Sequence, residues 1–394
     1  MTTPDPQHAA GRDAAPRRVL HVAHNALPHI GGLETVVAAE TRGLAARGWE
    51  VALLSSASGA TPGIRREEGV QEVRIRAWNG LEPRFGVPFP VFSPRLFWAM
   101  WRQVRWADLV HIHDPLYLTS WVGALWCRLL GTPYVVHRHV GFVHHSSLFV
   151  RLVQRVVLGS VARLVLRGAE VILPIDEFVA SDLRASLRAA RVEVLPNGVD
   201  TTHFRPARDL EREELRLELG LPDDRPLALF VGRFVPKKGF AWVAAAAGDA
   251  YALVFVGGDR PPNLTDPRLH FLGTVSANRM PLVYRCADVM VVASVGECPL
   301  TVLEALSCGL PVLLNEDPAL HSPWTSGPGV RFIDMDAGDL AGAIESLVAD
   351  PAAIRAMGDE GRRHVESNFS WGAHLDQLEV VYRDVLAATG SDTP

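Results

Sequence analysis

Short apolar runs alternate with amphipathic helical patterns along almost the whole 394-residue chain. In the first half, the runs predicted as strands are Val19–Ala23, Val51–Ser55, Val73–Ala77, Leu109–His113, Tyr134–His139, Val171–Pro174 and Val192–Leu195. In the second half, they are Leu227–Val231, Leu253–Val256, His270–Leu272, Val289–Ala293 and Pro311–Leu314. Helices are predicted at Glu34–Ala46, Leu118–Leu130, Leu148–Arg167, Asp339–Val348, Ala352–Glu366 and Trp371–Ala387. Strands that alternate with helices are typical of parallel sheets covered on both faces.

The alternation occurs twice, which predicts an α/β protein of two Rossmann-like domains that face each other across a cleft. We expect the N-terminal domain at 17–200 and the C-terminal domain at 215–370. Between them, the segment 201–214 is rich in Pro, Asp and Arg, lacks apolar periodicity, and is predicted as a linker. Residues 1–16 are polar and rich in Pro and Ala, which predicts a disordered tail, and residues 371–394 would form a last helix and tail.

The composition narrows the class of protein. The chain is 48% hydrophobic and 21% charged, as in an ordinary globular enzyme, and its net charge of −5 argues against nucleic-acid binding. The four cysteines form no CxxC pair, so the spacing indicates neither a zinc site nor a disulfide framework. The uncharged stretches are too short to span a bilayer, and the first residues lack the apolar core of a signal peptide. We expect a cytoplasmic protein.

The chain has only two lysines, Lys237 and Lys238, among 39 basic residues. They lie with Arg233 in a loop that follows a predicted buried strand, and such strand ends are where α/β proteins bind ligands. A lysine ammonium is a compact charge suited to phosphate, and an arginine guanidinium adds a planar fork. The loop is therefore a candidate diphosphate site. The alternative is a solvated turn with two adjacent charges.

A second candidate is the turn Gly31-Gly32 after the first predicted strand. Glycines allow a ligand to approach the backbone closely, and the helix that follows offers unpaired amides and the positive end of its dipole. The turn therefore favours an anion or a polar acceptor. The motif is not GxGxxG, so a dinucleotide is not favoured, and a plain turn is the alternative.

Histidines end two of the predicted strands. His139 follows Arg138 at the end of one strand, where it could donate to a phosphate or a sugar hydroxyl or take part in proton transfer. A structural histidine is the alternative. His111 and His113 hold a similar position on the preceding strand and receive less weight. Because their spacing shows no clear ligand pattern, no metal site is expected.

The third candidate site follows the predicted strand Val289–Ala293. Thr301–Cys308 is predicted as a short helix that ends at Gly309, and the amides of Leu300 and Thr301 at its start favour an anion. Glu304 lies within this helix among apolar residues, where a carboxylate can accept hydrogen bonds from a vicinal diol such as ribose. An exposed glutamate is the alternative.

Taken in their order along the chain, these candidate sites resemble those of the retaining GT-B glycosyltransferases of family 4, over residues 18–385. The resemblance implies a donor site for a nucleotide-diphosphate sugar, linked to UDP or GDP. The donor-binding residues that it implies are Gly31, Gly32, Arg233, Lys238, Val275, Leu300, Thr301 and Glu304, and the catalytic residues are His139, Arg233, Lys238 and Glu297. The segment 195–200 also matches, and the last helix resembles the one that crosses back onto the N-terminal domain.

One motif departs from the family pattern. The family has two glutamates with seven residues between them, whereas Glu297 and Glu304 have six between them. Aligned without a gap, Gly296 takes the first position and the sugar-contacting carboxylate is missing. With a one-residue deletion, which we favour, Glu297 takes that role.

The implied reaction is transfer of a hexose to a hydroxyl with retained α configuration, without metal or cofactor. The acceptor would be a lipid-linked or glycan intermediate or a small natural product. Aromatic residues cluster in the N-terminal half at Phe85, Phe89, Phe92, Phe97, Trp98, Trp101 and Trp106. With Arg151, Arg155, Arg163 and Arg167 on one predicted helix face, they allow contact with the inner membrane surface, and a solvated face over core aromatics is the alternative. The rival functions are a GT-B epimerase or hydrolase, a phosphorylase, and a non-catalytic nucleotide-sugar binder.

Overall fold

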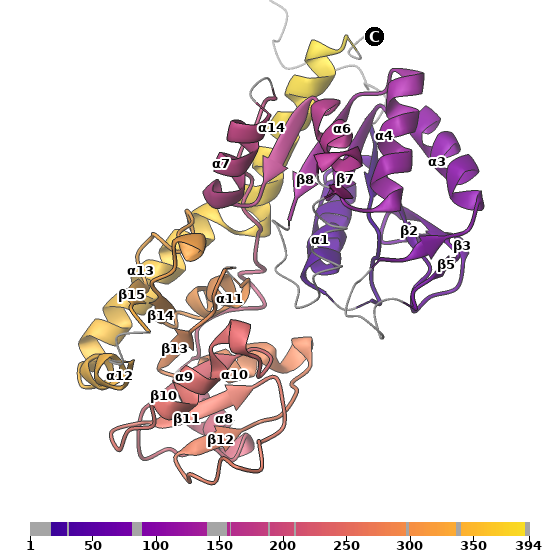
Figure 1. Ribbon diagram of the computed structural model, residues 1–394. Helices are drawn as coiled ribbons and strands as arrows, with labels where there is room; N and C mark the ends of the chain where they lie inside the picture. Colours follow the sequence, from indigo (N-terminus) through magenta and orange to yellow (C-terminus); the bar gives the residue numbers. More distant parts are fainter. Residues whose placement is uncertain are drawn as a thin grey trace, which may run out of the picture. The chain divides into compact units, whose positions relative to one another are not determined.

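The structure is a computed structural model, which describes residues 17–29, 31–80, 89–139, 156–157, 159–187, 190–208, 210–296, 299–335 and 340–390 (Figure 1). The chain forms two compact units. The first unit comprises the chain up to Ile175, together with Leu183–Glu193 and the segment from Gln377 onward. The second comprises Asp176–Asp182 and Val194–Asp376. Each unit has its own sheet, as the twofold alternation of strands and helices predicts.

The sheet of the first unit has seven strands in the order β3-β4-β2-β1-β7-β8-β9. The strands are β1 (Arg18–Val22), β2 (Glu50–Ser56), β3 (Gly63–Glu67), β4 (Val70–Ile75), β7 (Leu109–His113), β8 (Tyr134–Arg138) and β9 (Val171–Pro174). All neighbours are parallel except β3, which pairs antiparallel with β4 at the edge. A separate two-stranded ribbon joins β5 (Ala77–Trp78) and β6 (Val91–Phe92). The central strand β1 lies between β2 and β7, and its residues from Val19 to Val22 are fully or almost fully buried.

Helices cover both faces of this sheet. They are α1 (Gly32–Ala46), α3 (Arg95–Trp106), α4 (Leu118–Leu130), α6 (Val161–Arg167) and α7 (Glu177–Ser186), the last of which is divided between the two units. A Cβ on Gly123 of α4 would lie 3.7 Å from both Ile112 of β7 and Met100 of α3, so these two helices pack on the face of the sheet that carries Ile112. The opposite face carries His111 and His113, because side chains alternate along a strand.

The second unit has a six-stranded parallel sheet in the order β12-β11-β10-β13-β14-β15. The strands are β10 (Leu227–Val231), β11 (Ala252–Val256), β12 (Leu269–Phe271), β13 (Val289–Val292), β14 (Val312–Asn315) and β15 (Val330–Ile333). Its α-helices are α8 (Glu211–Glu218), α9 (Phe240–Ala245), α10 (Met280–Cys286), α11 (Thr301–Ser307), α12 (Leu340–Val348) and α13 (Pro351–Asn368). Three short 3-10 helices are η1 (Pro236–Lys238), η2 (Ala277–Arg279) and η3 (Pro318–Leu320). Apolar side chains pack on both faces of the sheet, which explains the uninterrupted apolar runs of its strands.

The last helix, α14 (Trp371–Ala388), begins in the second unit, and its residues from Gln377 onward belong to the first. Tyr382 on this helix is fully buried, and its hydroxyl lies 2.5 Å from Nδ1 of His111. The C-terminal helix thus completes the fold of the first unit, as the resemblance implies.

Several predicted elements differ from the structure. Val192–Leu195 is not a strand, because only Val192 forms an isolated bridge to Ile172. Helix α8 begins at Glu211, inside the segment predicted as a linker. The predicted helix 148–167 falls partly outside the described residues, and its described C-terminal part is α6. The predicted tail at 1–16, Phe85, Arg151 and Arg155 also lie outside the described residues.

Candidate functional site

The second unit brings most of the predicted donor-binding residues to one edge of its sheet. Strands β10 and β13 are parallel neighbours, so the loops that follow them emerge side by side. Arg233 and Lys238 follow β10, and Leu300, Thr301 and Glu304 follow β13. The topology therefore gathers two segments that are distant in sequence at the carboxyl edge, where open α/β sheets bind ligands.

The loop after β10 is held in place by backbone contacts. The amide of Val295 donates to the carbonyl of Lys237 at 2.9 Å, which joins this loop to the one after β13. Gly239 has a φ of 68°, and a Cβ there would lie 2.2 Å from the carbonyl oxygen of Ala293. Only glycine meets both demands. These contacts fix the backbone that carries Lys238, while Arg233 is exposed at the start of the loop.

Helix α11 begins at the same edge of the sheet. Its first amides have no intrahelical acceptor, because the first N–H groups of a helix lack one. The hydroxyl oxygen of Thr301 is buried and has no hydrogen-bond partner among the described residues. A buried hydroxyl without a partner is unfavourable, and a ligand oxygen at this position would satisfy it. The start of α11 is therefore suited to an anionic or polar ligand.

Glu304 is held by a residue that the sequence did not single out. The hydroxyl of Tyr284 on α10 donates to Oε2 of Glu304 at 2.6 Å. Burial raises the pKa of Glu304 above its ordinary value, and this hydrogen bond opposes that shift. Tyr284 is fully buried, and burial raises the pKa of its phenol well above 10. The glutamate is thus partly buried and orientated by Tyr284, so it is not a solvated surface residue.

Two side chains on or after β14 hold the loop that leads toward α11. Oδ2 of Asp317 accepts from the amide of Gly296 at 2.9 Å, and the side-chain amide of Asn315 donates to the carbonyl of Ser294 at 3.1 Å. Both positioning residues were missed from the sequence. Their only signal was polar character directly after an apolar strand. Glu297, the predicted sugar-contacting residue, lies outside the described residues.

Val275, one of the donor-binding residues that the resemblance implies, follows β12 and is partly buried against the core of the second unit. It is carried by a turn at Gly273, which has a φ of 67° and whose carbonyl accepts from the amide of Gly257 at 2.9 Å. Because all strands of this sheet are parallel, Val275 lies at the same carboxyl edge as the Arg233 loop. Strand β11 separates β12 from β10, so Val275 lies to one side of that loop.

In the first unit, the glycine turn adjoins a carboxylate. Glu34, in the first turn of α1, is buried, and its Oε1 lies 2.8 Å from Nδ1 of His29. A Cβ on Gly31 would lie 2.2 Å from Oε2 of Glu34, although the φ of Gly31 is extended and suits any residue. A side chain at Gly31 would therefore collide with the Glu34 carboxylate but would not strain the backbone. Gly32 is the first residue of α1.

His139 follows β8 and lies beside other histidines. Its Nε2 is 3.0 Å from Nδ1 of His113, and its backbone amide donates to Oδ1 of Asp114 at 3.0 Å. The structure therefore places His139, Gly31 and Gly32 in the first unit and the remaining described donor-binding residues in the second.

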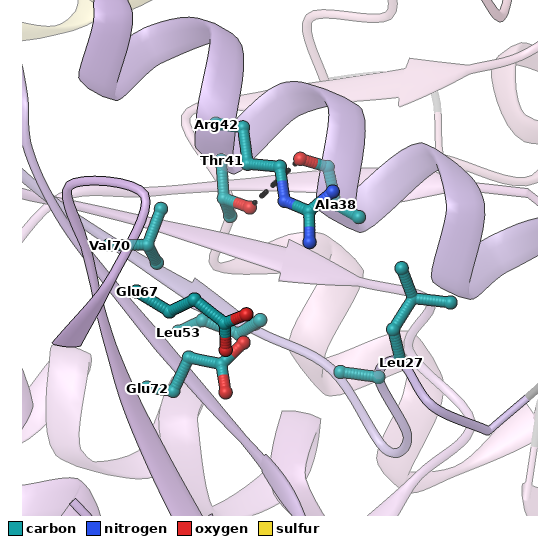
Figure 2. Close-up of a pocket in the computed structure, with 9 residues that line it drawn as sticks. Leu27, Ala38, Thr41, Arg42, Leu53, Glu67, Val70 and Glu72 are labelled. Carbon is teal, nitrogen blue, oxygen red and sulfur yellow. Dashed lines mark hydrogen bonds between the residues drawn. The ribbon is translucent and has the colours of Figure 1, made fainter. Parts of the chain in front are cut away.

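Two pockets among the described residues contain none of the predicted site residues. One is bounded by α1, β2, β3 and β4, and Thr41, Arg42 and Glu67 are among the residues that line it (Figure 2). The other lies in the second unit between the end of α8 and the end of β12, where Arg260 stacks over Phe271 at 4.8 Å.

The aromatic residues that cluster in the N-terminal half are partly exposed and partly buried. Phe97 and Trp98 on α3 are exposed, whereas Phe92 is buried. Trp98 stacks on Trp101 at 4.9 Å, and the guanidinium of Arg105 lies over the Trp101 ring at 5.0 Å. Among the described residues, none of the helices combines the length and apolar character that crossing a bilayer requires.

Comparisons with known proteins assign the family. Residues 30–203 match the model of Glycosyltransferase Family 4, and residues 225–350 match that of Glycosyl transferases group 1. D-inositol 3-phosphate glycosyltransferase of Acidothermus cellulolyticus is 30% identical, over 97% of this chain and 95% of the relative. Alpha-maltose-1-phosphate synthase of Mycolicibacterium smegmatis is 27% identical, over 71% of this chain and 80% of the relative.

Solved structures agree at the level of the fold. Sucrose-phosphate synthase of Thermosynechococcus elongatus superposes with a TM-score of 0.71 at 23% identity. The match covers 94% of this chain and 100% of the synthase chain. HepE of Anabaena in complex with UDP-glucose superposes with a TM-score of 0.70 at 15% identity. The match covers 93% of this chain and 99% of the HepE chain.

Two Rossmann-like units, each with a mainly parallel sheet, together with these matches define a GT-B glycosyltransferase, and the chain belongs to glycosyltransferase family 4. It is a hexosyltransferase that uses a nucleotide-sugar donor.

Proposed function

We propose that this enzyme transfers a hexose from a UDP- or GDP-linked donor to a hydroxyl group of its acceptor, with retention of the α configuration. The observation that supports the proposal is the shared carboxyl edge of β10 and β13, where the Val295–Lys237 hydrogen bond joins the Arg233 loop to the segment that leads to α11. Two cations from one loop and the start of a helix from the other suit a diphosphate.

In this proposal, Arg233 and Lys238 neutralise the diphosphate as it departs. Because charge builds up on the leaving group in the transition state, fixed cations there lower the barrier more than they strengthen substrate binding. The hydroxyl of Thr301 and the amide of Leu300 bind a second phosphate oxygen. No metal is needed at the donor site, since the two side chains supply the positive charge.

Glu304 accepts hydrogen bonds from the ribose hydroxyls of the donor. The bond from Tyr284 occupies its Oε2, which leaves Oε1 for a ligand. Val275 contacts the base, Glu297 contacts the transferred sugar, and His139 and the Gly31-Gly32 turn complete the site. The acceptor hydroxyl attacks from the face that the diphosphate leaves, and the leaving phosphate takes the proton of that hydroxyl.

The names of the relatives favour a phosphorylated acceptor. They are called inositol 3-phosphate glycosyltransferase, maltose-1-phosphate synthase and sucrose-phosphate synthase. We therefore place a small phosphorylated polyol or sugar ahead of the lipid-linked acceptor. A lipid-linked acceptor is supported by the exposed Phe97 and Trp98 and by the three arginines of α3, which could contact an anionic membrane.

The proposal is tested by incubating UDP- and GDP-hexoses with a panel of polyol phosphates, sugar phosphates and lipid-linked sugars. Proton NMR of the product reads its anomeric configuration. We expect an α-linked product from one donor base and a loss of at least about 100-fold in kcat for Arg233→Ala, the size typical of removing one group that stabilises transition-state charge.

Three results would count against the proposal. A β-linked product would contradict retention. Conversion of the donor at the full rate without any acceptor would indicate the hydrolase or epimerase, and donor binding without product for every acceptor would indicate a non-catalytic binder.

A further inference from the structure

Five histidines lie on one face of three adjacent strands in the first unit. His21 on β1 pairs in register with His111 on β7, and His113 on β7 pairs with His137 on β8. His139 follows β8 two residues after His137, so it lies on the same side. This face would ordinarily carry apolar side chains, because helices cover it.

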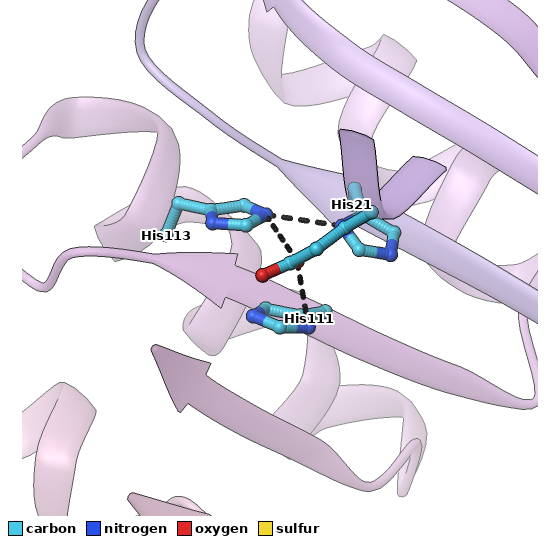
Figure 3. A group of neighbouring side chains, drawn as sticks. His21, His111 and His113 are labelled. Carbon is cyan, nitrogen blue, oxygen red and sulfur yellow. Dashed lines mark hydrogen bonds and ion pairs between the residues drawn. The ribbon is translucent and has the colours of Figure 1, made fainter. Parts of the chain in front are cut away.

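The histidine face is buried beneath two helices. Glu40 on α1 and Tyr382 on α14 both reach it, and the side chains of Glu40, His21, His111 and His113 are 0% exposed. A carboxylate and several imidazoles without access to water are costly unless they are paired or bind a cation. Figure 3 shows the rings of His21, His111 and His113 gathered around one point.

The distances from Glu40 to three of the histidines suit a shared ion better than direct hydrogen bonds. Oε2 of Glu40 lies 3.7 Å from Nδ1 of His21, 3.8 Å from Nδ1 of His111 and 3.7 Å from Nε2 of His113. These three separations are longer than a hydrogen bond. With metal–ligand bonds of about 2.0–2.1 Å, two ligands of a tetrahedral zinc ion lie about 3.3 Å apart. Nδ1 of His21 and Nε2 of His113 lie 3.0 Å apart, within hydrogen-bonding distance and slightly closer than two ligands of a tetrahedral zinc ion.

Three of the four candidate ligands also have a partner on their other polar atom. Nε2 of His21 lies 3.4 Å from the hydroxyl of Tyr382, Nδ1 of His113 lies 3.0 Å from His139, and Oε1 of Glu40 lies 3.1 Å from His137. Metal ligands in proteins usually have such outer partners, which fix the tautomer and the ring orientation.

His111 is the exception among the four. Its Nδ1 lies 2.5 Å from the hydroxyl of Tyr382, and its Nε2 is buried and has no hydrogen-bond partner within the part of the chain that the structure describes. An ion would replace Tyr382 as the partner of Nδ1, and the hydroxyl would remain near His21.

The donor atoms also suit a cation. Three imidazoles and a carboxylate form a donor set that suits zinc and similar divalent transition metals.

We propose that His21, His111, His113 and Glu40 bind one divalent transition-metal ion of the zinc type, in a closed structural site between β1, β7, α1 and α14. The ion joins α1, which carries Glu40, to β1 and β7, and Tyr382 of α14 lies beside the site. It lies within the first unit and takes no part in neutralising the donor diphosphate.

The test uses the full chain with any affinity tag removed, because a polyhistidine tag would bind the same metals. After dialysis against a weak chelator, elemental analysis should find about one zinc per chain. The cobalt(II) form should show the strong visible absorption of four-coordinate cobalt. Zinc should raise the melting temperature of the chelator-stripped protein by roughly 5 °C or more.

Variants then assign the site. Glu40→Gln keeps the shape of the side chain and should lose at least about tenfold in zinc affinity, whereas His321→Gln changes an exposed histidine of the second unit and should retain full binding. Circular dichroism verifies that both variants fold.

Less than a tenth of an equivalent of zinc in the wild-type protein, without the cobalt spectrum, would overturn the proposal and leave a hydrogen-bonded histidine network. Undiminished zinc affinity in Glu40→Gln would overturn it as well. Because the wild-type measurement needs no variant, the test remains decisive if Glu40→Gln fails to fold.

Discussion

Tyr284 donates a hydrogen bond of 2.6 Å to Oε2 of Glu304, and both residues lie in the second unit on neighbouring helices. The tyrosine ring packs edge-on against Phe204 at 5.8 Å, so its hydroxyl has little freedom to move. The carboxylate therefore has one oxygen fixed by the protein. In the proposed donor complex, the other oxygen binds ribose.

Tyr284→Phe should weaken UDP binding. Loss of the hydrogen bond leaves Glu304 less well orientated, and we expect the Kd for UDP to rise about fivefold, or about 1 kcal/mol. Isothermal titration calorimetry measures this. The matched control is Tyr251→Phe, which removes another buried hydroxyl of the same unit, bonded to the carbonyl of Ala246. Equal affinities for the Tyr284→Phe variant and the wild type would argue against a ribose contact at Glu304.

The same variant should shift the pH dependence of UDP affinity. Burial raises the pKa of Glu304, and the hydrogen bond from Tyr284 lowers it, so its removal raises the pKa further. An ionised carboxylate is the stronger acceptor for ribose, and affinity falls as the pH drops through this pKa. The fall should therefore begin at a higher pH in Tyr284→Phe than in the wild type. A fall at the same pH in both proteins would show that another group controls it.

Gly239→Ala should destabilise the second unit and disturb the loop of Lys238. The new Cβ would occupy a left-handed backbone position and approach the carbonyl of Ala293 to 2.2 Å. We expect a loss of about 2–4 kcal/mol in the free energy of unfolding, together with weaker donor binding. Urea denaturation with and without UDP measures both effects.

Gly220→Ala is the control for backbone strain alone. Gly220 has a φ of 65° but no atom within 4 Å of an added Cβ, so this variant should cost only about 1 kcal/mol. Similar losses in the two variants would mean that the contact with Ala293 has no effect of its own.

Glu211 should stabilise the protein at neutral pH and lose this effect in acid. Arg205 binds both of its carboxylate oxygens at 3.0 Å, and this contact, followed by the amide of Arg208, lowers the pKa of Glu211 to about 2. The contribution is complete above the unfolded pKa, near 4.3, and disappears as the pH falls toward 2. We expect Glu211→Gln to cost about 1 kcal/mol at pH 7, since water screens partly exposed ion pairs.

Urea denaturation at pH 7, 5 and 3 follows the difference between Glu211→Gln and the wild type, which should shrink between pH 5 and 3. Asp224→Asn removes a fully exposed ion pair with Arg225 and should leave stability unchanged. A difference for Glu211→Gln that persists undiminished at pH 3 would exclude the ionised pair as its cause.

The sequence predicted the strands that are buried on both faces, because their uninterrupted apolar runs do not depend on context. It missed β3, whose five residues are all exposed, because an edge strand with charged side chains has the composition of a loop. No strand was predicted for β15, because a four-residue strand that contains an arginine shows little hydrophobic pattern. The strand predicted at 192–195 has apolar character but pairs only through Val192.

The loop that we propose as the donor site could be singled out because glycines, lysines and a helix start carry local signals. The Tyr284–Glu304 bond could not, since it joins two helices through packing alone. His111 and His113 were given less weight because the next segment begins with Pro115, which favours a turn of the chain. The period-two spacing of His111 with His113, and of His137 with His139, is visible in the sequence. That His21 and Glu40 join them depends on strand order and helix placement, which local patterns do not determine.

The central claim is that Lys238 binds the donor diphosphate. The adjacent Lys237 provides a control with the same side chain. Calorimetric titration of UDP into wild type, Lys238→Ala and Lys237→Ala, at one salt concentration, compares two variants with the same loss of charge. We predict that Lys238→Ala raises the Kd about 30-fold, or about 2 kcal/mol, while Lys237→Ala stays within about twofold of the wild type. Equal effects of the two substitutions, or unchanged binding in Lys238→Ala, would contradict the diphosphate site.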